Sequence, residues 1–148
     1  MKSRITAKEL LTAFVLLVVI AAIAVPMWRT HQLRIHRQDA MHSLRALQTA
    51  QDDYFGKYAR YASEAQLRAS APHALSDKTP SGKSLSRRGY YQLTLHKSDD
   101  DLGYTAVARV VPLEGQTDTR CVELRIDQNG RRYAVDSEGV DRSADCWR

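Results

Sequence analysis

Hydrophobic residues form an almost unbroken run near the start of the chain. Between Leu10 and Val25 the only polar residue is Thr12; Lys8 and Glu9 precede the run, and Pro26 ends it. The run is longer than a soluble helix needs, and slightly shorter than the ~20 residues of a full membrane span. It fits either a cleaved secretory signal peptide with a basic start or a retained membrane helix. The helical pattern continues beyond Pro26, which favours retention.

The pattern changes after Pro26 from fully apolar to amphipathic. No glycine or proline occurs from Met27 until Gly56, and apolar residues recur close to heptad spacing. This stripe consists of Leu33, Ala40, Leu44, Leu47 and Tyr54. Together the two parts predict one helix of roughly 50 residues, in which Pro26 produces a kink or a local loosening because it lacks a backbone donor. Gly56 is the expected C-cap, and the aromatic residues around it are expected to pack where helix meets sheet.

The second half of the chain alternates between apolar and polar residues. Residues 68–88 are rich in Ser, Ala, Pro and Lys and predict a surface loop that starts with a short helical turn. Four strands are expected after it, with a hairpin turn at Gln128-Asn129-Gly130 between the last two. They are Tyr90–His96, Tyr104–Val111, Cys121–Asp127 and Arg131–Val135. Alternation indicates an antiparallel sheet with one buried face, which the amphipathic helix must cover.

The chain is basic, with 22 Lys and Arg against 17 Asp and Glu, a net charge of +5. Its length predicts one domain plus an anchor. The charge fits either an ordinary solvated surface or a site for anions such as nucleic acid. Four arginines are the candidates for anion binding: Arg87 and Arg88 at the end of the predicted loop, and Arg131 and Arg132 at the start of the last predicted strand.

Cys121 and Cys146 are the two cysteines of the chain. An even pair behind a membrane-targeting segment predicts a disulfide formed in an oxidising compartment such as the periplasm. Metal binding would need further ligands. Two unrelated free thiols are the alternative.

No motif in the sequence indicates catalysis or a cofactor. Three histidines of the predicted helix are spaced by 5 and 6 residues and so do not share a helix face. Asp99, Asp100 and Asp101 are expected to form a solvated turn, with calcium binding as the alternative because hard cations bind clustered carboxylates. Asp136, Glu138 and Asp141 are a second calcium candidate.

The N-terminal segment ITAKELLTAFVLLVVIAAIAVPMWR resembles the N-terminus of type IV pilins. The resemblance places the first mature residue at Ile5, the glutamate of the fifth mature position at Glu9, and the helix proline at Pro26. The passage YFGKYARYA is similar to the family's sequence at the end of the long helix. With the terminal Cys-Trp, the pattern is most similar to minor pilins of the PilE kind.

The resemblance implies an α+β pilin fold. A long N-terminal helix would pack on a four-stranded antiparallel sheet, followed by a disulfide-closed C-terminal segment. The implied division is a leader at residues 1–4, a transmembrane or filament-core helix at 5–26, and a periplasmic head at 27–148. In this family the glutamate at the position of Glu9 pairs with the amino terminus of a neighbouring subunit and sets the stagger during filament assembly.

Arg4 stands where the family's prepilin peptidase cleaves after glycine. Two expectations are open: slow or absent cleavage between Arg4 and Ile5, or a permissive peptidase. Cleavage would be followed by methylation of the new amino terminus.

The resemblance implies a structural subunit of a type IV pilus that is not an enzyme and has no cofactor. Its expected roles are pilus assembly and possible contributions to adhesion, twitching motility or DNA uptake. Its expected partners are other pilins in a helical filament, the inner-membrane assembly machinery, the prepilin peptidase and the membrane itself, with nucleic acid as a further candidate. The expected location is the inner membrane, and the pilus surface after assembly. The alternatives are a pseudopilin of type II secretion, which a calcium requirement would favour, and a filament-tip pilin that binds DNA or another anion.

Overall fold

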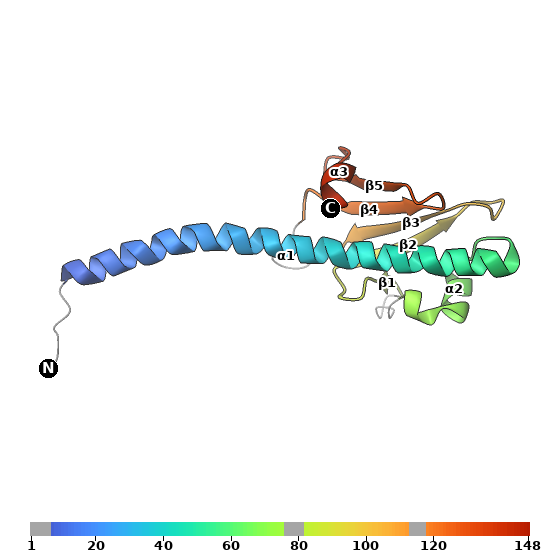
Figure 1. Cartoon of the computed structure of the whole chain (residues 1–148), viewed down its shortest axis with the longest axis horizontal. Helices are drawn as coiled ribbons and strands as arrows, with labels where there is room; N and C mark the ends of the chain where they lie inside the picture. Colours follow the sequence, from blue (N-terminus) through green and yellow to red (C-terminus); the bar gives the residue numbers. More distant parts are fainter. Residues whose placement is uncertain (1–6, 76–81, 113–117) are drawn as a thin grey trace. The chain divides into compact units, whose positions relative to one another are not determined.

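The computed structural model describes residues 7–75, 82–112 and 118–148. It divides into two compact units, Met1–Ile35 and His36–Arg148. The second unit combines helices with a five-stranded antiparallel sheet in the order β1-β2-β3-β4-β5 (Figure 1). Along the chain the elements are α1 (Ala7–Tyr58), α2 (Glu64–Ser70), the 3-10 helix η1 (Pro72–Ala74), β1 (Ser84–Leu85), β2 (Tyr91–Lys97), β3 (Tyr104–Val110), β4 (Glu123–Asp127), β5 (Arg132–Val135) and α3 (Ser143–Cys146).

Helix α1 runs unbroken through the whole apolar segment and on into the second unit. Its large apolar residues from Leu10 to Trp28 are exposed, and by length and composition α1 could cross a membrane. The helix also continues through Pro26. Thr30 donates its hydroxyl to the carbonyl oxygens of Pro26 and Met27 at 3.0 and 2.9 Å, which binds the side chain to the turn that contains the proline.

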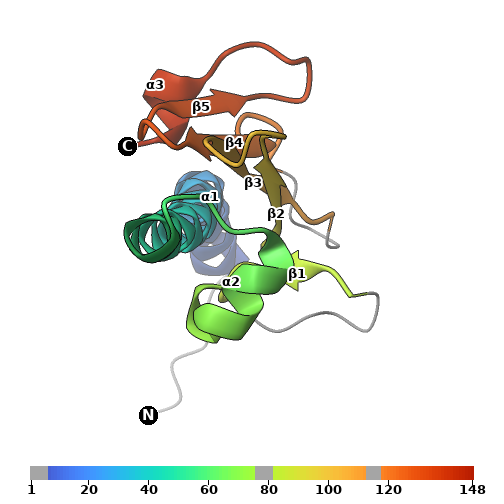
Figure 2. The ribbon, with the colours of Figure 1, turned by 90° about the vertical axis from the view of Figure 1, so that its right-hand side faces the viewer.

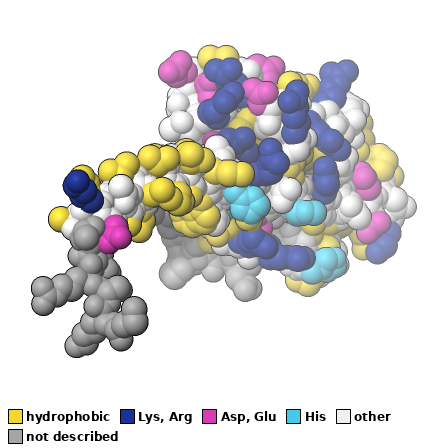
Figure 3. All heavy atoms as spheres, turned by 60° about the vertical axis from the view of Figure 1, so that its left-hand side comes forward, with side chains coloured by type: hydrophobic (Ala, Val, Ile, Leu, Met, Phe, Trp, Pro, Cys, Tyr) yellow, Lys and Arg dark blue, Asp and Glu magenta, His cyan; other side chains and the backbone are white. Residues whose placement is uncertain are grey.

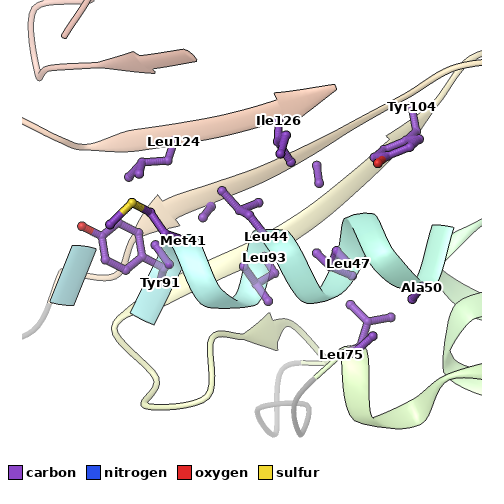
Figure 4. Packing of buried hydrophobic residues seen from close by; sticks show 14 of the residues in the cluster. Met41, Leu44, Leu47, Ala50, Leu75, Tyr91, Leu93, Tyr104, Leu124 and Ile126 are labelled. Carbon is purple, nitrogen blue, oxygen red and sulfur yellow. The ribbon is translucent and has the colours of Figure 1, made fainter. Parts of the chain in front are cut away.

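Four of the five residues predicted for the stripe of α1 are buried, and Leu33 is half-buried. Ala40, Leu44 and Leu47 are fully buried, and Tyr54 is nearly so. All four belong to one cluster with sheet residues such as Tyr91, Leu93, Leu124 and Ile126, and Figure 4 shows Leu44 and Leu47 among them. Burying each leucine contributes about 1.5–3 kcal/mol, so this interface supplies much of the unit's stability.

The end of α1 lies two residues beyond the predicted C-cap. Gly56 is inside the helix, and Ala59 adopts the left-handed conformation (φ 53°), with its amide bonded to the carbonyl of Phe55 at 2.8 Å. Gln51, fully buried in α1, then holds the departing chain through both the N–H and the C=O of Ala62 at 2.8 Å each. Side-chain hydrogen bonds therefore fix the exit from the helix.

The region after α1 is more structured than the loop predicted for residues 68–88. Ser63 and Gln66 form a capping box that starts α2, and Leu67 anchors this helix in the core. Residues 76–81 of the predicted loop lie outside the described residues.

The sheet has five strands, and the prediction of four is therefore wrong. The additional strand, β1, pairs Ser84 with Leu93 and Leu85 with Gln92. Its sequence carries no alternation because it is two residues long and is held by backbone pairing to β2. The four predicted strands all exist, with bounds shifted by up to two residues.

Register places alternate residues of β2–β5 on opposite faces. One face carries the row Leu93–Ala108–Leu124–Ala134, which belongs to the core beside α1. Figure 2 shows α1 lying against one side of the curved sheet, with α2 beside β1. The opposite face is not covered by α1 and is termed the outer face below.

The C-terminal segment closes the sheet edge at β5. Cys121 and Cys146 form the predicted disulfide. Arg142 donates its amide to Ala134 O at 2.8 Å, and Trp147 donates its indole N–H to Tyr133 O at 3.0 Å. The tail, predicted to be irregular, thus contains the short helix α3 and covers an edge that could otherwise pair with other chains.

Candidate functional site

The outer face carries polar and charged side chains at the positions that alternate with the core rows. Arg109 on β3 pairs with Glu123 on β4, and Arg125, two residues further along β4, pairs with Tyr133 on β5. The face as a whole is formed by Gln92, Thr94, His96, Thr105, Val107, Arg109, Glu123, Arg125, Asp127, Tyr133 and Val135.

Two arginines of the outer face enclose one glutamate. Arg109 donates to Glu123 Oε2, with its Nε at 2.8 Å, and Arg125 donates to Oε1 of the same carboxylate. The side chain of Glu123 is 4% exposed, whereas those of Arg109 and Arg125 are 67% and 47% exposed. The negative charge is thus buried beneath two guanidinium groups, and the charge that solvent meets here is positive.

The electrostatics of this cluster follow from that arrangement. Burial alone would raise the pKa of Glu123, but the hydrogen bonds from Arg109 and Arg125 outweigh it, and the pKa lies below its ordinary value. Glu123 is therefore ionised at neutral pH and orients both guanidiniums. Each arginine still has N–H groups for an external anion, since a guanidinium carries five donors.

A shallow depression of about 770 Å³ extends across β2, β3 and β4 on this face. Besides the arginine cluster, its lining includes Lys83, just before β1, and His96 on β2. The amide of Gln92 and the hydroxyl of Thr94 add neutral hydrogen-bonding groups. Such a surface suits extended anions with several oxygen acceptors, such as a chain of phosphates.

Arg37 and Asp118 connect the sheet to α1. The carboxylate of Asp118, which is almost fully buried, accepts from Arg37 Nε and Nη2 at 2.6 and 2.9 Å. It also accepts the backbone amides of Arg120 and Cys121 at 3.2 and 3.1 Å. This network fixes the segment that leads into β4, the strand that carries Glu123 and Arg125.

The four arginines predicted for anion binding do not lie together. Arg87 and Arg88 are exposed in the turn between β1 and β2, where the Arg88 amide donates to the Asp39 carboxylate of α1. Arg131 is exposed in the turn before β5. Arg132, the first residue of β5, lies over the ring of Trp147, 5.4 Å from its centroid.

Strand register shows how far apart the two pairs are. The turn with Arg88 leads into Tyr91, which pairs with Val110, whereas the turn with Arg131 follows Asp127, which pairs with Thr105. Val110 and Thr105 are roughly 17 Å apart along β3. The two arginine pairs are also two to three strands apart across the sheet. Arg109 and Arg125 lie between these ends, and the sequence predictions did not include them.

Two of the three aspartates of the β2–β3 turn, Asp100 and Asp101, are engaged by neighbouring residues. Asp100 accepts from Ser98 Oγ and from the amide of Leu102, and the bond from Ser98 lowers its pKa. Asp101 pairs with Lys97. Among the described residues no group of three or more His, Cys, Asp or Glu is arranged to hold a metal ion.

The second calcium candidate is also built into a turn. Asp136 accepts the amides of Glu138 and Val140 and pairs with Arg142 at 2.9 Å. Asp141 accepts the amide and the hydroxyl of Ser143. These hydrogen bonds give Asp136 and Asp141 a role in holding the turn that does not require a cation.

The predicted assembly residue, Glu9, lies exposed in the first turn of α1. Arg4 and Ile5, predicted to flank the processing site, lie outside the described residues. Figure 3 shows hydrophobic side chains over most of the visible part of the first unit, with charged side chains near its end, and Lys and Arg side chains spread over the visible part of the second, with Asp and Glu among them.

Comparison with known proteins identifies a family for most of the chain. A family model described as "Type IV minor pilin ComP, DNA uptake sequence receptor" matches residues 26–125. A solved structure, a type IV pilin from Shewanella oneidensis, is 18% identical and matches 65% of this chain and 84% of its own, with a TM-score of 0.44. No curated protein matches the chain.

Proposed function

From the premise that this chain belongs to the ComP family of type IV minor pilins, we propose that it binds DNA through the outer face of its sheet. The main observation behind this proposal is that the side chains of Arg109 and Arg125 are exposed on this face, whereas Glu123 is buried beneath them. The description of the family names a DNA uptake sequence receptor, and the charge that the Arg109–Arg125 cluster presents to solvent has the sign that DNA requires.

As a type IV pilin, the chain is a subunit that assembles with other pilins. We propose residues 5–26 as the anchor and filament-core helix, and residues 27–148 as a periplasmic head that is exposed on the pilus. Glu9 would pair with the amino terminus of a neighbouring subunit, because an ion pair within a bundle of apolar helices is specific for register. The inner-membrane assembly machinery and the prepilin peptidase are the further partners of this proposal.

The outer face is suited to phosphates for a geometric reason. Arg109 and Arg125 extend from adjacent strands, and Lys83 lines the same depression. A rigid sheet therefore presents several cations at fixed spacing, which lowers the ordering cost of binding a regular polyanion. The turns with Arg88 and Arg131, at opposite ends of the sheet, would extend the contact beyond the depression.

The test measures DNA binding by the full chain in detergent micelles. Fluorescence anisotropy of a labelled duplex gives the affinity over a range of salt concentrations. The double variant Arg109→Ala/Arg125→Ala should bind more weakly and make the plot of log K against log salt shallower by about 2, since each lost phosphate contact removes about 0.9. A matched control is Arg45→Ala/Lys57→Ala, which removes two exposed cations of α1.

The control separates the outer face from net charge. If binding depends on the outer face, the α1 variant keeps the affinity and slope of the native chain. Equal losses in both double variants would mean that DNA responds to overall charge, and the proposal would be wrong. Absence of any salt-dependent duplex binding by the native chain would also refute it.

A further inference from the structure

Tyr133 stands beside a hollow on the outer face that differs in character from the basic depression. The hollow has a volume of about 330 Å³, at the lower end of the range of small-ligand sites. It is bounded by β4, by β5 and by the turn that contains Gly139. Its side-chain lining includes Thr105, Arg125, Asp127, Tyr133, Val135 and Asp141.

Tyr133 is 44% exposed, although it belongs to a strand of a well-packed sheet. Among the described residues its ring takes part in none of the aromatic ring–ring contacts. Its backbone is held on both sides, by pairing with Arg125 and by the bond from Trp147 to its carbonyl. Tyr133 is therefore a fixed aromatic surface available for stacking.

Two carboxylates in the hollow can accept hydrogen bonds. Oδ1 of Asp127 accepts the amides of Asn129 and Arg131, both at 2.9 Å, and Oδ1 of Asp141 accepts from Ser143. Oδ2 of each has no hydrogen bond to the described residues. The bonds from Ser143 lower the pKa of Asp141, so it is ionised at neutral pH and acts only as an acceptor.

This lining selects a base over a phosphate. Carboxylates repel phosphate but accept hydrogen bonds from the exocyclic amino groups of bases. Arg125, shared by the hollow and the basic depression, lies where a phosphate next to the bound base would be attracted. Stacking on Tyr133 requires an open base face, which a base inside a duplex lacks because its neighbours cover both faces.

We propose that this hollow binds an unpaired base of single-stranded DNA that carries an exocyclic amino group, such as cytosine or adenine, stacked on Tyr133 with its amino group directed at Asp127 and Asp141. The inference rests on the proposed DNA-binding function. It adds a preference for certain bases, which contacts to phosphate alone cannot supply. Thymine, which has no exocyclic amino group, leaves the carboxylates without a partner and binds more weakly.

The experiment measures anisotropy of the full chain in detergent with labelled single strands of dC, dA and dT of equal length, and with the duplex used above. The native chain should bind the dC and dA strands more tightly than the dT strand. Tyr133→Ala should weaken binding of the dC strand about 5- to 150-fold, the range expected for loss of one base–aromatic stack. Its affinity for the duplex should fall by a smaller factor than its affinity for the dC strand, because a paired base offers no open face to the ring.

Two further variants make the test specific for the ring. Tyr133→Phe keeps the stacking surface and should bind the dC strand like the native chain. Tyr133→Leu keeps an apolar side chain of similar bulk without an aromatic face, and should lose affinity as the alanine variant does. If the alanine variant does not fold, the leucine variant tests the role of the ring in its place.

The outcomes separate the two proposals. If the alanine and leucine variants bind the dC strand as the native chain does, or if the dT strand binds as tightly as dC, the hollow does not read a base. Duplex binding that still depends on Arg109 and Arg125 would then leave the proposed function intact. If neither duplex nor single strands bind, both proposals are wrong.

Discussion

At the scale of single residues, Glu123 controls the charge of the proposed DNA-binding face. It is the buried anion between Arg109 and Arg125, and it neutralises part of their charge while orienting their guanidinium groups. These two effects act in opposite directions on an external anion. Because the arginines are already held by a rigid sheet, we expect the charge effect to dominate.

Glu123→Gln should therefore bind duplex DNA more tightly than the native chain, with a steeper dependence on salt. The glutamine keeps the shape and can still accept a hydrogen bond, but it removes one negative charge from the centre of the face. Anisotropy over a salt series checks this. Asp53→Asn, which removes an exposed carboxylate from α1, is the control. Weaker DNA binding by Glu123→Gln would show instead that orientation of the arginines matters more than charge.

A second residue, Gln51, is critical for folding. It is fully buried and satisfies both backbone groups of Ala62, so Gln51→Ala leaves a buried N–H and a buried C=O unpaired. We expect a loss of about 2–4 kcal/mol in the free energy of unfolding. Denaturant unfolding in detergent, compared with Gln38→Ala at an exposed position of the same helix, measures it. A midpoint equal to that of the control would contradict the role assigned to Gln51.

At the scale of elements, what the sequence predicted depended on the length of each pattern. The amphipathic stripe and the four alternating strands were predictable because burial of one face imposes a period on many residues. Strand β1 was not predictable because two residues carry no period and its pairing uses the backbone. The continuation of α1 past Gly56 was missed because tertiary bonds from Gln51, rather than a glycine cap, set the exit.

The same reasoning applies to the candidate site. Alternation in residues 104–111 and 121–127 already assigns Arg109 and Arg125 to the face opposite the buried residues, so they could have been found. The predicted arginines came from the end of a loop and the start of a strand, and the sequence does not show how far apart those two places lie in space. The hollow beside Tyr133 was beyond prediction, since it depends on how the turn around Gly139 folds back over β5.

The disulfide is the covalent element of the C-terminal segment. It closes β4, β5 and α3 into one loop, and both of its cysteines are buried. Replacing Cys121 and Cys146 by serine should lower the free energy of unfolding by ~3–4 kcal/mol on the chain-entropy model, because the unfolded chain gains freedom. Unfolding curves of the double variant test this, with the reduced native chain as a second comparison. A loss below about 1 kcal/mol would show that packing alone holds this segment.

At the scale of the whole molecule, we expect the function of the subunit to depend on whether its N-terminus is processed. A subunit cleaved before Ile5 has a new amino terminus and can enter the filament core. A subunit that keeps Arg4 lacks this amine and carries extra positive charge that resists extraction from the membrane. Sequence alone leaves the two outcomes open.

We expect Arg4 to make cleavage slow or absent, because its long cationic side chain replaces the glycine that allows close approach of the backbone. Intact-mass analysis of the native protein measures this directly. A species beginning at Met1 or Lys2 is the expected result. A species beginning at Ile5, above all one with an added methyl group, would show that the peptidase accepts arginine, and Arg4→Gly provides the matched cleaved reference.

The central claim, that this minor pilin binds DNA with the outer face of its sheet, is tested most directly by arginine footprinting. The full chain is treated with phenylglyoxal with and without saturating duplex DNA, and modification of each arginine is measured by mass spectrometry. The account predicts that DNA protects Arg109 and Arg125 while Arg45 on α1 is modified at the same rate in both samples. Equal modification of Arg109 and Arg125 with and without bound DNA would contradict it.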